Sequence, residues 1–410
     1  MDATENTGER PQLSLAERDR RWRVIRDSMA KKNLSCLIIW GDSGKWDSKM
    51  AHVRYVSHVG GNGEEAVCIF PLEGDPTVII WIKVHSFEWV EGHSWVSDIR
   101  GRDFGSWSGS IGHRIKELKL DKEKIGVVGL GGGTEGEGAI PHGVYEQLKA
   151  SLPKAKFENA TEMLAGLELI KSPEEIDFME RATEIGNLGA KVMAECAKPG
   201  TSEREVIASA MYTMIKAGSD HPIMFLFNSG SPPFARRSSR LMYTRGRTLR
   251  SGDLINTEYS PRYGGYYSHL QRTIFVGEAR KEYKEMFKIA LESHHAGLKV
   301  LRPGVKLGDL VRIMDEPIKK AGLHLCGPYF HGIGQQWMPP WGFPLEPRGD
   351  IDVMPPADRN QEMKAGMVLA FEVAPKTQNG EISFSIGDPI LVTETGARSL
   401  SKLDVEMVTT

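Results

Sequence analysis

The chain has 410 residues, 40% of them hydrophobic, with a formal net charge of −2 at pH 7 and a pI near 6.7. This length can bury more than one core, so two domains are expected, and the near-neutral charge gives no global basic field of the kind that attracts nucleic acid. The four cysteines form no C-x-x-C pair, and the sequence shows neither a membrane-length apolar run nor a signal-peptide core. We therefore expect a soluble, cytoplasmic protein without a zinc knuckle, a membrane anchor or a nucleic-acid partner.

The first part of the chain has the pattern of a compact α/β domain. Ser14 and Glu17 have the spacing of a capping box, and apolar residues at helical spacing follow them. Short apolar runs then predict buried strands, of which the middle two form a hairpin around a Gly-Asp-Pro turn; the runs are 36–40, 66–70, 77–81 and 124–128. Strands that alternate with helices in this way predict an α/β domain over residues 1–165.

A second domain, residues 166–410, is expected to begin with a capped helix. Ser172 is a typical N-cap, Pro173 occupies the first helical position, and Glu175 completes a capping box. A helix is therefore predicted from this point to residue 196. Further amphipathic helices are predicted at 202–218, 283–301 and 307–322.

The stretch from Gly252 to Gly277 predicts a β-hairpin that carries the main functional candidates. Apolar residues flank a Pro-Arg-Tyr-Gly-Gly turn, and polar residues recur at strand spacing on both arms. Side chains two apart on a strand share a face. Each arm therefore directs one polar pair to a common cleft: Asn256 and Glu258 from the first arm, and His269 and Gln271 from the second.

Three later segments add further candidates. His331 lies in a Tyr-Phe-His-Gly-Ile-Gly segment, and Glu372 ends the apolar run that starts at Gly366. Gly387 and Asp388 open the last apolar run. Imidazoles and carboxylates are the usual groups for acid–base chemistry and for binding transition metals. Asp388 is expected at a turn or a sheet edge and not among the metal ligands.

The hairpin and these segments resemble, in order and spacing, the pita-bread superfamily, which includes methionine and Xaa-Pro aminopeptidases, prolidase and creatinase. The resemblance covers residues 169–410 and implies an α+β fold, in which a small N-terminal α/β creatinase-like domain precedes a C-terminal pita-bread domain. The peptidase hairpin carries two Asp ligands, whose positions are held here by Glu258 and His269, and the position of the last bridging Glu is Gly387. A dinuclear centre needs bridging carboxylates to hold two cations together. A dimetal aminopeptidase is therefore not expected.

Within the superfamily, the hairpin resembles most closely the creatinase and ectoine-hydrolase branch. This resemblance implies an enzyme that hydrolyses a non-peptide C–N bond, in an amide, an amidine or a cyclic amide, without a cofactor. In this interpretation His269 or His331 shuttles protons, Glu372 is an anchor or base, and Glu258 is a base or nucleophile. Creatine itself is not expected as the substrate, because Gln271 stands where creatinase has a second Glu.

Two alternatives remain open at this point. His269, His331 and Glu372 correspond to the ligands of one of the two family metals, and such a set suits a single divalent transition metal in a hydrolase or a lyase. Alternatively, the chain is a non-catalytic binding module, since the fold also serves proteins that have lost their metals. The retention of Glu258 with these three residues, and the lack of a charged extension, disfavour the binding module.

Several residues are expected to bind the substrate. Arginines crowd the loop before the hairpin and could clamp a carboxylate or phosphate, which predicts a small anionic substrate. Aromatic residues after His331 predict a rigid wall for a ring or an apolar group. The complete set is Arg236, Arg237, Arg240, Gln271, Tyr266, Trp337 and Trp341. From the resemblance to creatinase, we also expect a homodimer.

Overall fold

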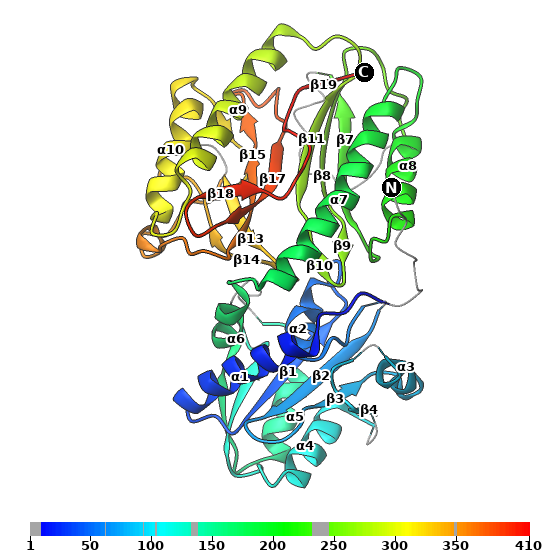
Figure 1. Ribbon diagram of the computed structural model, residues 1–410, viewed down its shortest axis with the longest axis vertical. Coiled ribbons are helices and arrows are strands. Elements are labelled where there is room, and N and C mark those ends of the chain that lie inside the picture. Colours follow the sequence, from blue (N-terminus) through cyan, green and yellow to red (C-terminus); the bar gives the residue numbers. More distant parts are fainter. Residues whose placement is uncertain are drawn as a thin grey trace. The chain divides into compact units, whose positions relative to one another are not determined.

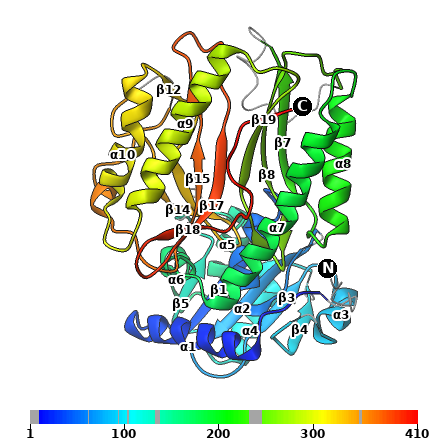
Figure 2. The ribbon, with the colours of Figure 1, turned by 45° about the horizontal axis from the view of Figure 1, so that its top comes forward.

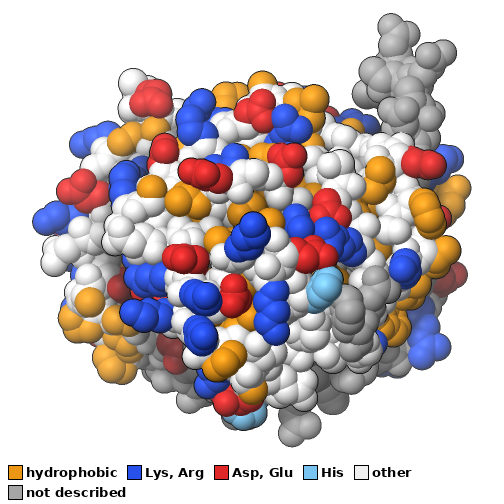
Figure 3. Space-filling model, turned by 90° about the horizontal axis from the view of Figure 1, so that it is seen from below, with side chains coloured by type: hydrophobic (Ala, Val, Ile, Leu, Met, Phe, Trp, Pro, Cys, Tyr) orange, Lys and Arg blue, Asp and Glu red, His pale blue; other side chains and the backbone are white. Residues whose placement is uncertain are grey.

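The computed structural model describes residues 10–61, 63–92, 94–102, 105–132, 138–231, 246–347 and 351–410 (Figure 1). The chain divides into two compact units, Met1–Glu168 and Leu169–Thr410, close to the boundary expected after residue 165. None of the described helices combines the length and apolarity needed to span a membrane. In the space-filling view of Figure 3, basic and acidic side chains are interspersed, in keeping with the small net charge.

Within its described residues, the first unit contains a six-stranded mixed sheet in the order β4-β3-β2-β1-β5-β6. Its strands are β1 Cys36–Asp42, β2 Glu65–Pro71, β3 Thr77–Ile80, β4 Asp98–Gly101, β5 Lys124–Val128 and β6 Lys156–Asn159. Its helices are α1 Leu15–Lys31, α2 Ala51–Ser57, α3 Ser86–Val90, α4 Trp107–Glu117, α5 His142–Ser151 and α6 Thr161–Glu168. Ser14 Oγ accepts the N–H of Glu17 at 3.1 Å, so the first helix begins where the sequence predicts. The expected α/β domain and its β2–β3 hairpin are confirmed.

The second unit is built around a larger sheet, with nine strands in the described residues. The main path runs β14-β13-β15-β17-β11-β8-β7, while β18 pairs with β17 and β19 with β11. These strands are β7 Met224–Gly230, β8 Leu254–Ser260, β11 Leu270–Phe275, β13 Phe330–Ile333, β14 Trp337–Trp341, β15 Val368–Val373, β17 Ile386–Val392, β18 Ala397–Ser399 and β19 Val408–Thr409. Short two-stranded pairs join β9 Arg262–Tyr263 to β10 Tyr266–Tyr267 and β12 His324–Leu325 to β16 Pro375–Lys376.

Four long helices cover this sheet in two pairs, as Figures 1 and 2 show. They are α7 Pro173–Cys196, α8 Glu203–Lys216, α9 Lys281–Val300 and α10 Leu307–Lys320. Both α7 and α8 begin at capping boxes, the first formed by Ser172 and Glu175 as predicted. Each pair closes its own hydrophobic core against the strands. This arrangement of helix pairs on a common sheet is the predicted α+β architecture.

Glycine allows α7 to approach the sheet closely. A Cβ added at Gly186 would lie 2.2 Å from Leu270 Cδ1 of β11, a distance that real side chains do not tolerate. Tyr259 of β8 then donates its hydroxyl to the Gly186 carbonyl at 3.3 Å. The helix is therefore seated directly on the two strands of the predicted hairpin.

A buried ion pair connects β11 to β17. Arg272 Nη2 donates to Asp388 Oδ1 at 2.6 Å, and Nη1 donates to the carbonyl of Gly387 at 2.6 Å. The two charged side chains are only 7% and 4% exposed. Asp388 therefore lies in a central strand, and the expectation of a turn or a sheet edge is wrong. The sequence pattern does not show that Arg272 supplies the counter-charge a buried carboxylate needs.

Removing one partner of this pair is expected to destabilise the second unit strongly. We expect Arg272→Met to lower the free energy of unfolding by about 3–5 kcal/mol, because Asp388 is left buried without a counter-charge. The double variant Arg272→Met/Asp388→Leu removes both charges and should recover most of the loss. Urea unfolding followed by circular dichroism measures both changes. A double variant as unstable as the single one would contradict this account.

Candidate functional site

Strand register places three polar residues and one glycine in a row across the sheet of the second unit. Glu258 in β8 pairs with Gln271 in β11. Gln271 pairs with Gly387 in β17, and Gly387 pairs with Glu372 in β15. Directly opposed residues point to the same side of a sheet. The side chains of Glu258, Gln271 and Glu372 therefore share one face, with Gly387 between the last two.

The two imidazoles lie next to this row, two residues away from it along their strands. His269 precedes Leu270, which pairs with Tyr259 in the hairpin, and the Nδ1 of His269 lies 3.0 Å from the Oγ of Ser260. His331 in β13 pairs with Ala370, two residues before Glu372 in β15. The fold thus brings together Glu258, His269, His331 and Glu372, which the sequence places over 115 residues.

The atoms that meet at the centre of the site are electron-rich. His331 Nδ1 donates to the carbonyl of Gly332 at 2.9 Å, so in the neutral ring Nε2 carries a lone pair. This Nε2 lies 3.3 Å from Glu372 Oε1. His269 Nε2 lies 3.5 Å from Glu372 Oε2 and 3.7 Å from Glu258 Oε1, and it has no hydrogen-bond partner in the described chain. Lone pairs of the imidazole nitrogens and of the carboxylate oxygens repel one another at these distances, so a proton or a cation is needed between them.

Burial favours the neutral form of both imidazoles. Desolvation lowers the pKa of His269 from its ordinary value of 6.5, although the neighbouring Glu258 opposes this shift. Desolvation also lowers the pKa of His331; Glu372 opposes the shift and His269 adds to it. In contrast to these buried rings, the side chain of Glu258 is 27% exposed. The site therefore combines two neutral nitrogen bases with a carboxylate that reaches solvent.

Three of these residues also fit a single metal ion. One ligand atom from each of His269, His331 and Glu372 lies within 4.8 Å of the others. Two neutral imidazoles and a carboxylate suit Zn(II), Fe(II) or Mn(II), and the unpartnered Nε2 of His269 is the atom that such an ion would engage.

A second cation would lack a bridging ligand at Gly387. A Cβ added there would lie 2.1 Å from the carbonyl oxygen of Phe371, so this backbone leaves no room for a side chain. The close packing of β17 against β15 therefore excludes a carboxylate side chain at position 387.

Some of the expected substrate-binding residues do surround this centre. Gln271 Nε2 donates to Glu372 Oε2 at 2.5 Å, which leaves Gln271 Oε1 without a partner in the described residues. The ring of Trp337 lies 6.5 Å from that of His269 and 6.2 Å from that of His331, and Trp341 lies 4.9 Å from His331. The predicted aromatic wall therefore stands beside both imidazoles.

Other expected residues do not contribute to the centre. Tyr266 is 1% exposed and donates its hydroxyl to Glu175 of α7 at 3.0 Å, so it ties the hairpin to the helix instead of facing a substrate. Asn256 points to the site face, but its Oδ1 accepts hydrogen bonds from the N–H and hydroxyl of Ser385. The predicted residues that lie outside the described chain are Arg236, Arg237 and Arg240. Arg247, from the same arginine-rich loop, forms an ion pair with Asp253 at 2.7 Å.

Two polar residues on the site face, Ser260 and Asn228, are not among the residues predicted from the sequence. Ser260 continues the alternation of Asn256 and Glu258, so strand spacing alone could have identified it. Asn228 lies opposite Asn256 on β7. Its signal was weaker, because β7 is rich in aromatic residues and no partner strand is evident nearby in the sequence.

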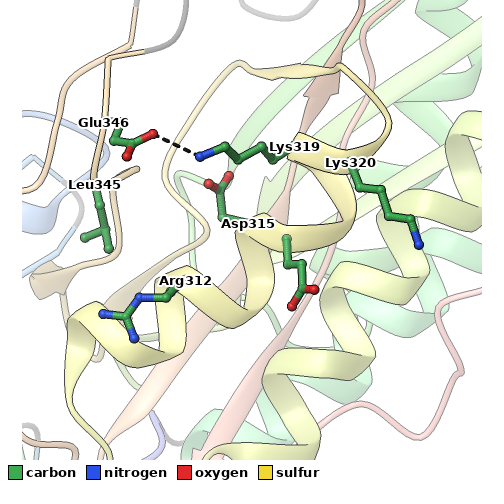
Figure 4. Close-up of a pocket in the computed structure, with 7 residues that line it drawn as sticks. Arg312, Asp315, Lys319, Lys320, Leu345 and Glu346 are labelled. Atoms are coloured by element: carbon green, nitrogen blue, oxygen red, sulfur yellow. Dashed lines mark hydrogen bonds and ion pairs between the residues drawn. The ribbon is translucent and has the colours of Figure 1, made fainter.

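A surface hollow of about 560 Å³ lies elsewhere in the second unit, along α10 (Figure 4). Several of its charged side chains form ion pairs. Lys319 Nζ lies 3.1 Å from Glu346, and Arg312 Nη1 lies 2.7 Å from Asp309. None of its lining residues belongs to the polar row or to the two imidazoles beside it, so the hollow is not part of the candidate site.

Known families and proteins are similar to this chain. Residues 177–394 match metallopeptidase family M24, and residues 21–170 match the creatinase/prolidase N-terminal domain. The Xaa-Pro dipeptidase of Pyrococcus furiosus is 28% identical over 300 residues, which are 72% of this chain and 78% of that protein. The creatinase of a Bacillus species is 24% identical over 275 residues, which are 62% of each chain.

Solved structures show the same fold at low sequence identity. The X-Pro aminopeptidase from Thermotoga maritima has a TM-score of 0.78 and 17% identity, and the match covers 95% of this chain and 99% of that one. The prolidase from Pyrococcus horikoshii has a TM-score of 0.73 and 21% identity, with 95% and 100% covered. Because the family match spans more than half of the 410 residues, the chain belongs to metallopeptidase family M24.

Proposed function

We propose that this M24-family hydrolase cleaves a non-peptide C–N bond of a small substrate at a centre that holds at most one metal ion. The observation that carries the proposal is the pairing of Gly387 with Glu372, where the backbone leaves no room for a bridging carboxylate. His269 stands in place of a second bridging group. Two cations held close together need such shared carboxylates to offset their repulsion.

Glu258 is the residue best placed to act as a general base. Its carboxylate reaches solvent and lies 3.7 Å from the Nε2 of His269, at the edge of the buried centre. In this role it accepts a proton from water while the water oxygen attacks the carbon of the scissile bond. The proton then passes to the leaving nitrogen as the C–N bond breaks.

The lone pairs at the centre support one bound cation more than the metal-free alternative. Burial lowers the pKa of both imidazoles, which disfavours a proton in the space between His331 Nε2 and Glu372 Oε1, 3.3 Å apart. A cation held by His269, His331 and Glu372 would polarise the scissile group and the attacking water. Gln271 would orient the Glu372 carboxylate by donating to it. Without a metal, His269 or His331 would instead shuttle the proton.

We also propose that the substrate is anionic and that the protein forms a homodimer. An anionic substrate depends on Arg236, Arg237 and Arg240, and loss of turnover in Arg237→Ala/Arg240→Ala would support it. The homodimer depends on the resemblance to creatinase, and a sedimentation experiment at micromolar concentration tests it.

Turnover is expected to depend on Glu258. Small amides, amidines and lactams with an acidic group form the first screen. For any compound that is hydrolysed, we expect Glu258→Gln to lower kcat/KM by about 10²–10⁴-fold, because the general base is lost. Glu381→Gln, an exposed position in the same unit, is the matched control and should leave the rate unchanged. Undiminished turnover in Glu258→Gln would rule out its role as base.

The metal content of the purified protein distinguishes a centre with one metal ion from a metal-free centre. Elemental mass spectrometry of the purified protein is expected to find about one transition metal per chain, and little in His269→Ala, because one imidazole ligand is removed. His295→Ala, an exposed histidine of the same unit, is the control. Two metals per chain would refute the proposed centre. No metal in either protein would favour proton shuttling by His269 or His331.

A further inference from the structure

One buried amide on the site face has no partner. Asn228 on β7 lies directly opposite Asn256 on β8, so its side chain shares the face that carries Glu258. The residue is 5% exposed, and neither Nδ2 nor Oδ1 forms a hydrogen bond within the described chain. Burial of a carboxamide without partners is costly, since both its donor and its acceptor lose their hydrogen bonds to water. A ligand that binds both atoms would offset this cost.

The adjacent Asn256 shows that the same face can satisfy an amide internally. Its Oδ1 accepts from the N–H of Ser385 at 2.8 Å and from the Ser385 hydroxyl at 2.9 Å. The two asparagines face each other across the β7–β8 ladder and are about equally buried. They differ in that, among the described residues, a hydrogen-bond partner exists for Asn256 and not for Asn228.

A further unsatisfied atom lies in the row formed by Glu258, Gln271, Gly387 and Glu372. Gln271 Nε2 donates to Glu372, which fixes the orientation of the amide, and Gln271 Oε1 has no partner in the described chain. Gln271 pairs directly with Glu258, and Glu258 lies diagonally across from Asn228, a separation of about 7–8 Å in antiparallel sheets. The side chain of Glu258, which neighbours both amides, is 27% exposed and so connects this face to solvent.

We propose that Asn228 and Gln271 are substrate-positioning residues, and that the substrate carries a cis-amide edge, as in a lactam, a ureide or a primary amide. An ammonium group would satisfy only Asn228 Oδ1, and a carboxylate only Nδ2. A cis-amide edge presents an N–H donor and a carbonyl acceptor side by side and satisfies both atoms at once. A trans peptide bond presents these groups on opposite edges and cannot.

Gln271 requires a hydrogen-bond donor at a particular place on the substrate. Its Oε1 can only accept a hydrogen bond, so it binds an N–H of the substrate beside Glu258. The inference rests on the proposed function, because it assumes that the face around Glu258 is the catalytic one. It narrows the possible substrates from amides and amidines in general to compounds with adjacent N–H and C=O groups.

Binding of simple probes tests the inference without turnover. Ligand-observed NMR compares 2-pyrrolidone, a lactam with a free N–H, with N-methyl-2-pyrrolidone, which has the same ring without the donor. We expect the wild type to bind the first at least about tenfold more tightly, and Asn228→Ala to bring the ratio close to one. No discrimination by the wild type, or an unchanged ratio in Asn228→Ala, would overturn the proposal.

Thermal stability supplies a readout that a merely structural asparagine would not give. Asn228→Leu removes an unsatisfied amide at nearly constant volume, so Tm is expected to rise by about 2–4 °C. Asn256→Leu, the matched control, breaks two hydrogen bonds and should lower Tm. A fall in Tm for Asn228→Leu comparable to that of the control would show a structural role and overturn the proposal.

Glu258→Gln separates this inference from the proposed reaction, since it should abolish turnover and keep the probe discrimination. If no C–N hydrolysis is found but Asn228→Ala still loses the discrimination, the positioning role stands and the reaction falls. If turnover depends on Glu258 but the probe ratio is the same in Asn228→Ala, the reaction stands and the positioning role falls.

Discussion

The hydrogen-bonded register of β8, β11, β17 and β15 is the constraint on which the site depends. It sets four positions side by side that are far apart in the chain: Glu258, Gln271, Gly387 and Glu372. A slip of one residue in any strand would turn its side chains to the opposite face. The buried pair of Arg272 and Asp388 opposes such a slip, because it joins β11 to β17 with a direct ion pair and a bond to the backbone. The interaction that stabilises the unit thus also maintains the geometry of the site.

The described site face carries two carboxylates, Glu258 and Glu372, among several neutral polar groups. His269 contributes a nitrogen, Gly387 contributes no side chain, and Gln271 and Asn228 contribute amides. Fewer negative charges reduce the capacity for a second cation, while the lone pairs of His269 and His331 remain directed at Glu372. In the proposed recognition, the pattern of hydrogen-bond donors and acceptors on Asn228 and Gln271, and not charge alone, distinguishes one substrate from another.

Sequence patterns predicted the structure correctly where the interactions involve residues close together in the chain. The capping box at Ser172 and the hairpin arms carrying Glu258 and His269 depend on residues within a few positions of each other, and the structure places them as predicted. Tyr266 and Asp388 were misjudged because their partners, in α7 and β11, lie 91 and 116 residues away. Spacing within a segment carries no information about such partners.

The sequence by itself determined the order of the main helices and the hairpin that carries Glu258 and His269, since hydrophobic periodicity, caps and turn residues act over short distances. The fold class of the second domain followed from the resemblance to the pita-bread superfamily. Through this resemblance, the sequence also predicted that bridging carboxylates of a dinuclear centre are missing at His269 and Gly387. Only the tertiary structure decided which polar atoms face one another. It turned His331 Nε2 toward Glu372, engaged Asn256 with Ser385 and left Asn228 buried without a hydrogen-bond partner in the part of the chain that the structure describes. These outcomes depend on strand register and side-chain packing across the whole sheet, which no single segment encodes.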